Sequence, residues 1–152
     1  SAAAGVASAT LAPTTLYLGD VSFLHDLHGL LATRHARGPL VILVANNDGG
    51  RIFERLPIAA SPAVDEDFER LWVMPHGCSA TDLARACGVR STAADTVAEL
   101  HDALRAAYEH GGVAVVEARI GRDATGADHT RALPAAHEGA ARGGAADHVE
   151  IE

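Results

Sequence analysis

An uninterrupted apolar run, Leu40-Val41-Ile42-Leu43-Val44-Ala45, restricts the fold of this chain more than any other feature. The run is too short to cross a bilayer. It has no polar alternation, so it predicts a strand buried on both faces, as strands are in a parallel sheet. Residues 113–118, which are apolar except for Glu117, predict a second buried strand, and the β-branched segment 14–18 predicts a further strand.

The segments between these strands carry helical signals. Apolar residues recur at helical spacing after Ser22, which is expected to cap that helix. Helices are also predicted over 81–87 and 92–110, with a short one around 65–72 in an otherwise irregular stretch. This order of elements predicts an α/β fold with a doubly wound parallel sheet.

The length of 152 residues suits one domain, which we assign to residues 1–136, with 137–152 as a disordered tail. The net charge is −8, which argues against nucleic acid and anionic membranes as main partners. No basic segment typical of a signal peptide precedes the first predicted strand, and only two cysteines occur. We therefore expect a cytoplasmic protein without membrane insertion.

Polar residues follow two of the predicted strands, at their carboxyl ends. Ligands of doubly wound folds bind outside the carboxyl ends of the strands, so these residues are candidates for one shared binding site. The first end is Gly19-Asp20-Val21-Ser22, directly before a helix, where backbone N–H groups favour phosphate. Asp20 would repel that phosphate unless a cation lay between them. The second end is Asn46-Asn47-Asp48-Gly49, in which Asn47 offers an amide oxygen and Gly49 a backbone carbonyl.

These donors are all hard oxygens. Together with two diphosphate oxygens and a water they would complete an octahedron, which suits Mg²⁺. The connection from Asp20 to Asn47 has room for one helix and one strand, so the two loops are expected to meet across adjacent strand tips. The sequence therefore predicts a metal site formed by Asp20, Asn47 and Gly49.

The pairing of Gly19-Asp20 with Asn46-Asn47 resembles the GD…NN signature of thiamine diphosphate enzymes. Residues 19–30 resemble the segment GDLSFLHDLNGL of one branch, and residues 46–57 resemble its segment NNDGGGIF…LP. That branch is the 2-succinyl-5-enolpyruvyl-6-hydroxy-3-cyclohexene-1-carboxylate synthase family of menaquinone biosynthesis, and the resemblance covers residues 1–135. The chain departs from the family's pattern at His28, at Arg51 and at 72–74, and it has Val21 where most of the superfamily has Gly.

The resemblance implies roles for individual residues. Asp20, Asn47 and the Gly49 carbonyl would hold Mg²⁺ or Mn²⁺, which anchors the cofactor diphosphate. The residues expected to bind thiamine diphosphate are Gly19, Asp20, Val21, Ser22, Asn47, Gly49, Gly50 and Ile52. Phe53 and Leu56 are expected to line the substrate pocket.

The resemblance also implies a transferase that decarboxylates 2-oxoglutarate and adds the resulting succinyl-semialdehyde unit to isochorismate. In the family, the Glu that activates the cofactor and the substrate-binding Arg residues lie outside the matching segment, so no catalytic residue is expected here. The chain thus resembles the C-terminal domain of a longer homo-oligomeric enzyme, truncated at its N-terminal side, and should be inactive alone. From the sequence, Glu117 is expected at a strand end, facing solvent or a nearby Arg, and His76 is expected in a loop that either lies at the surface or borders the active site.

Three alternatives remain open at this point. The chain could belong to another thiamine diphosphate enzyme, of the acetolactate-synthase or 2-oxoacid-decarboxylase type. It could be a nucleotide-binding or flavodoxin-like module, which would need no metal-binding Asp and Asn. It could also be a non-catalytic dimerisation domain.

Overall fold

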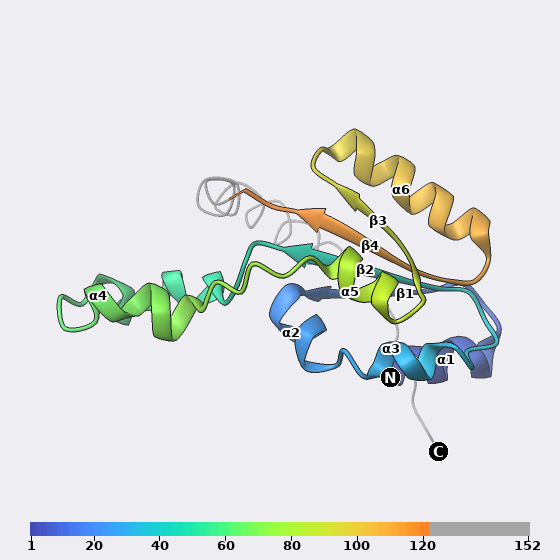
Figure 1. The fold of residues 1–152 in the computed structure, drawn as a ribbon, viewed down its shortest axis with the longest axis horizontal. Coiled ribbons are helices and arrows are strands. Elements are labelled where there is room, and N and C mark those ends of the chain that lie inside the picture. The colour runs from blue at the N-terminus through green and yellow to red at the C-terminus, as the bar shows by residue number, and fades with distance from the viewer. Residues whose placement is uncertain (122–152) are drawn as a thin grey trace, which may run out of the picture. The chain divides into compact units, whose positions relative to one another are not determined.

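The sheet has four parallel strands (Figure 1), three of which the sequence predicted. The computed structural model describes residues 1–121, without the side chains of 65 and 66, so the predicted tail 137–152 and the domain end at 136 lie outside the described residues. The strand order is β1-β2-β4-β3. The strands are β1 (Thr14–Gly19), β2 (Leu40–Asn46), β3 (Arg90–Ala94) and β4 (Val113–Arg119).

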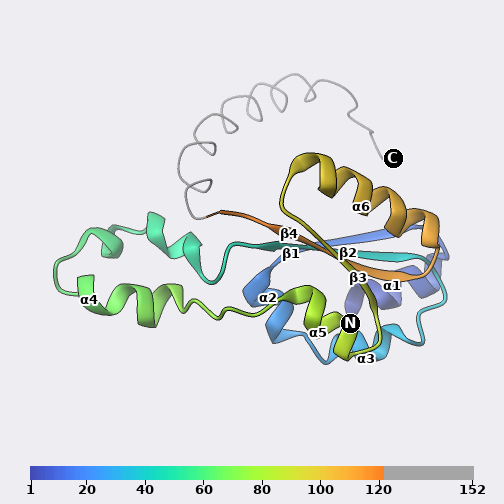
Figure 2. The same cartoon turned by 45° about the horizontal axis from the view of Figure 1, so that its top comes forward.

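Helices cover both faces of this sheet (Figure 2). On one face lie α1 (Ala2–Thr10), α2 (Asp20–His25), α3 (Gly29–Thr33) and α5 (Ala80–Ala86). On the other face lies α6 (Val97–His110). The doubly wound arrangement is therefore confirmed.

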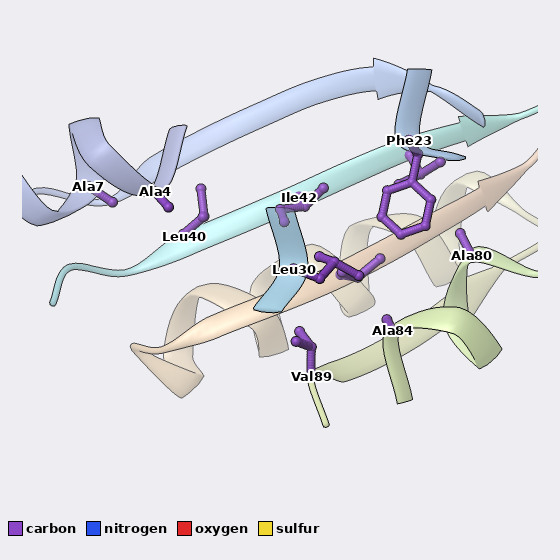
Figure 3. Packing of buried hydrophobic residues seen from close by; sticks show 11 residues of the cluster. Ala4, Ala7, Phe23, Leu30, Leu40, Ile42, Ala80, Ala84 and Val89 are labelled. Atoms are coloured by element: carbon purple, nitrogen blue, oxygen red, sulfur yellow. The ribbon is translucent and has the colours of Figure 1, made fainter. Parts of the chain in front are cut away.

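Strand β2 lies between these two helical layers, which explains its unbroken apolar sequence. Its residues Leu40 and Ile42 point into the larger core, where they pack with Phe23 and Leu30 (Figure 3). Val41 points into the smaller core beneath α6. Successive side chains of a strand point to opposite faces, so a strand covered on both sides is apolar at most of its positions.

Two predicted helix boundaries are wrong. The predicted helix 92–110 begins at Val97, and the residues before it form β3, which pairs with β4. Thr96 caps α6 through a capping box with Glu99, and this Thr-x-x-Glu pattern was a signal for the true start. The predicted helix after Ser22 is two short helices, α2 and α3, and Gly19 rather than Ser22 is the N-cap of α2.

The stretch between β2 and α5 forms an arm, residues 51–74, that extends beyond the carboxyl end of the sheet (Figures 1 and 2). It consists of short elements: η1 (Arg51–Arg55), η2 (Pro57–Ala60), α4 (Asp65–Phe68) and the π-helix η3 (Glu69–Val73). The Trp72 ring packs edge-on against Phe53, with ring centroids 5.8 Å apart, and stacks on Phe68. No helix in residues 1–121 is long and apolar enough to cross a membrane.

Candidate functional site

Asp20 joins the two strand ends that the sequence singled out. It is the first residue of α2 and only 4% exposed. Its Oδ1 accepts a hydrogen bond from the Val21 backbone N–H at 2.8 Å, and its Oδ2 accepts one from the Gly49 backbone N–H at 2.8 Å. The expectation that the loops after β1 and β2 meet at the sheet edge is confirmed by this second bond.

The turn after β2 is held in shape by side-chain hydrogen bonds. Asn46 Oδ1 accepts from the Asp48 N–H at 3.0 Å, and Asp48 Oδ1 accepts from the backbone N–H groups of His76 and Gly77 at 3.1 and 2.8 Å. Gly49 has a φ of +119°, and a Cβ there would lie 2.3 Å from the carbonyl oxygen of Val73. Only glycine fits at this position.

The side chain of Asn47 is half-buried and makes no hydrogen bond within the described part of the chain, in contrast to that of Asn46. The Asn47 backbone carbonyl accepts a hydrogen bond from Nε of Arg51 at 2.7 Å. The Arg51 guanidinium is buried and also forms ion pairs with Glu54 and Glu69 at 2.6 and 3.3 Å. Arg51, a departure from the family pattern, therefore connects this turn to the arm while the Asn47 amide stays available.

The remaining predicted site residues fall into two groups. Gly19 and Ser22 lie exposed around the tip of β1, and a Cβ on Gly19 would meet no atom within 4 Å. Gly50 directly precedes the arm, and its N–H donates to the Val73 carbonyl at 2.7 Å. Ile52, Phe53 and Leu56 lie on the arm itself, and Ile52 is 72% exposed.

Glu117 is a residue that sequence reasoning placed wrongly. It was expected to face solvent or a nearby Arg, but it is 0% exposed, because β4 is an inner strand covered on both faces. Its carboxylate accepts hydrogen bonds from Asn46 Nδ2 at 2.7 Å and from the backbone N–H groups of Ala80 and Thr81, both at 3.1 Å. Burial raises the pKa of Glu117, but these donors outweigh it and hold the pKa below its ordinary value. No local sequence signal marks this network, since its members lie on three separate elements.

His76 borders this site, which is the alternative to a surface loop that the sequence left open. Its side chain is 14% exposed, and Nε2 lies 3.1 Å from Oδ2 of Asp20. With Val21, Leu24, His25 and Met74, it lines a cavity of about 260 Å³ beside the tip of β1. Its neighbours Pro75 and Gly77 suggested a loop, which is correct, but only the fold shows that this loop returns to Asp20.

Among the described side chains of residues 1–64 and 67–121, no group of three or more His, Cys, Asp or Glu residues can hold a metal ion. A metal at Asp20 would therefore need amide, carbonyl and ligand oxygens to complete its coordination, which is the donor set that the sequence predicted. Mg²⁺ is commonly bound in this way, through one or two carboxylates and the phosphates of a ligand.

The family model for the thiamine pyrophosphate enzyme, C-terminal TPP binding domain, matches residues 1–118. The chain belongs to this family. Thiamine pyrophosphate is another name for thiamine diphosphate, so the family assignment confirms the cofactor class and excludes the flavodoxin-like module.

Relatives and solved structures agree with this assignment. The 2-succinyl-5-enolpyruvyl-6-hydroxy-3-cyclohexene-1-carboxylate synthase of Sorangium cellulosum is 48% identical over 124 residues, which cover 79% of this chain and 20% of the relative. The synthase of the same name from Chloroflexus aurantiacus is 38% identical over 95% of this chain and 24% of its own length. The chain thus spans about a fifth to a quarter of these curated relatives.

The benzoylformate decarboxylase of Polynucleobacter necessarius superposes with a TM-score of 0.66 at 23% identity, over 79% of this chain and 23% of that one. The thiamine diphosphate-dependent 4-hydroxybenzoylformate decarboxylase of Rhodococcus jostii RHA1 gives a TM-score of 0.58 at 22% identity, over 70% of this chain and 19% of that one. At these identities the likeness shows the fold of the TPP-binding domain and nothing about substrates.

Proposed function

We propose that this chain is the diphosphate- and metal-binding domain of a longer 2-succinyl-5-enolpyruvyl-6-hydroxy-3-cyclohexene-1-carboxylate synthase. The observation that carries the proposal is the 48% identity to a synthase of that name, combined with the contact of Asp20 with the turn after β2. The whole enzyme would take 2-oxoglutarate and isochorismate as substrates. We also propose that the whole enzyme is cytoplasmic and homo-oligomeric.

The residues at the sheet edge fit a metal-bound diphosphate. Asp20 would supply a carboxylate oxygen, Asn47 its otherwise unbonded amide oxygen, and Gly49 its backbone carbonyl to Mg²⁺ or Mn²⁺. The space in front of Gly19 leaves room for phosphate oxygens, which the exposed Ser22 hydroxyl would meet. The Val21 N–H is engaged by Asp20, so Val21 would act by holding the carboxylate.

Thiamine diphosphate, when bound, supplies the electron sink for decarboxylation. The described residues bind and orient the cofactor through its diphosphate end. Arg51 and the backbone contact between Gly50 and Val73 hold the metal-binding turn against the arm. Ile52, Phe53 and Leu56 then belong to the apolar part of the arm that would face the reacting end of the substrates, with Phe53 braced by Trp72.

The test uses the full-length protein with thiamine diphosphate and Mg²⁺. Release of CO₂ from 2-oxoglutarate, together with formation of the isochorismate adduct detected by mass spectrometry, is the expected result. Turnover of pyruvate or benzoylformate without 2-oxoglutarate turnover would instead identify another thiamine diphosphate-dependent decarboxylase or an acetolactate-synthase-like enzyme. The 152-residue chain alone is expected to release no CO₂ from 2-oxoglutarate.

A further inference from the structure

The imidazole of His76 is fixed in one orientation by a backbone N–H group two residues further along the chain. The Cys78 N–H donates a hydrogen bond to His76 Nδ1 at 2.9 Å. A ring nitrogen that accepts a hydrogen bond carries no proton, so this contact assigns the proton of the neutral ring to Nε2. Nε2, which lies 3.1 Å from Oδ2 of Asp20, is therefore the donor in that contact.

The two oxygens of the Asp20 carboxylate are used differently. Oδ2 receives two donors, the Gly49 N–H and His76 Nε2, at 2.8 and 3.1 Å. Oδ1 receives one donor, the Val21 N–H. Each carboxylate oxygen has about two lone-pair sites, so the hydrogen bonds fill those of Oδ2 and leave one on Oδ1.

We propose that His76 is a positioning residue of the cofactor site, which holds Oδ2 of Asp20 so that Oδ1 is presented to the metal ion. This inference rests on the proposed function, because it assumes that Asp20 is a metal ligand. His76 itself does not touch the metal. Hydrogen-bond partners of metal-binding carboxylates act in this way in many metal sites, where they fix the orientation of the ligand.

The backbone around His76 supports such a role. The His76 N–H donates to Asp48 Oδ1 at 3.1 Å, and the Gly77 N–H donates to the same oxygen at 2.8 Å. His76 is therefore anchored to the turn that carries Asn47 and Gly49, while its ring contacts Asp20 on the neighbouring strand tip. One residue thus connects the two loops that would share the metal.

The test measures metal affinity rather than turnover. In the full-length protein with saturating thiamine diphosphate, Mn²⁺ is titrated and free Mn²⁺ is followed by electron paramagnetic resonance. His76→Leu and His76→Gln form a matched pair of similar volume, and only Gln retains an N–H donor that can reach Asp20. His101→Ala, on the exposed surface of α6, is the control.

We expect His76→Leu to weaken Mn²⁺ binding by roughly 10- to 100-fold, as is typical for loss of a hydrogen-bond partner of a metal ligand. His76→Gln should recover most of that loss, and His101→Ala should bind as the wild type does. Unchanged affinity in His76→Leu, or equal losses in the Leu and Gln variants, would overturn the role of the donor. Failure of the proposed metal site is distinct, because the wild-type protein would then show no thiamine diphosphate-dependent Mn²⁺ binding. Failure of the proposed substrates is distinct as well, because it shows in the CO₂-release assay and leaves Mn²⁺ binding unchanged.

Discussion

Replacing Glu117 tests whether its buried carboxylate holds the three elements behind the site together. Oε1 accepts from Asn46 Nδ2 at 2.7 Å and from the Ala80 N–H at 3.1 Å, while Oε2 accepts from the Thr81 N–H at 3.1 Å and from Ser79 Oγ at 3.3 Å. In Glu117→Gln, one oxygen becomes an NH₂ group that faces a backbone N–H whichever way the amide is turned. Losing a charge-assisted hydrogen bond and leaving a buried donor unpaired should lower the free energy of unfolding by about 2–4 kcal/mol.

Glu117→Leu removes both acceptors and leaves the buried backbone N–H groups of Ala80 and Thr81 without partners, so it should cost more than Glu117→Gln, at least about 3 kcal/mol. The assay is urea unfolding followed by far-UV circular dichroism. The matched control is Glu109→Gln on the exposed surface of α6, which should change the free energy of unfolding by less than about 0.5 kcal/mol. A Glu117→Gln variant as stable as the wild type, or a Leu variant more stable than the Gln variant, would refute the reasoning.

Further perturbations probe the acid response, a helix cap and the metal-binding turn. The pKa of Glu117 is lowered in the folded protein, so its contribution to stability is complete above the ordinary carboxyl pKa of about 4.3 and is lost as the pH falls through the lower folded value. Glu117→Gln should therefore lose less stability than the wild type as the pH falls below about 4.5. Urea unfolding at several pH values measures this difference. Thr96→Ala, which removes the side-chain cap of α6, should cost about 1 kcal/mol in thermal unfolding, and Thr96→Ser should restore most of it; an Ala variant as stable as the wild type would contradict the cap. Gly49→Ala places a Cβ 2.3 Å from the Val73 carbonyl and should abolish thiamine diphosphate-dependent Mn²⁺ binding in a titration of the full-length protein, whereas Gly5→Ala in α1, whose Cβ meets no atom within 4 Å, should retain it.

The sequence predicted the parts of the fold that depend on burial and turn chemistry. The apolar runs predicted β2 and β4, and the polar groups after β1 and β2 predicted that the loops following these two strands would meet at the sheet edge. Both predictions rest on short sequence patterns, and the parallel topology then determines where these segments lie in space. Strand β3 was missed because Ser91, Thr92 and Ala93 are small or polar residues, unlike the large apolar residues of a buried strand. Its place in the sheet depends on pairing with β4, which is distant in the sequence.

The hydrogen-bond network behind the site could not be predicted in the same way. Glu117 lies 71 residues after Asn46 in the chain, and His76 lies 56 residues after Asp20. Residues that are so far apart in the chain show no periodic pattern in the sequence that would indicate their contact. A buried carboxylate is identified only when the strand that carries it is known to be an inner one.

The most direct measurement of the central claim is the position of the divalent ion in a crystal of the full-length protein grown with thiamine diphosphate and Mn²⁺. Anomalous diffraction from Mn²⁺ locates the ion independently of the protein atoms. The account predicts one anomalous peak within coordination distance of Oδ1 of Asp20, the amide oxygen of Asn47 and the carbonyl of Gly49. A bound cofactor whose Mn²⁺ peak lies away from Asp20 and Asn47 would contradict it.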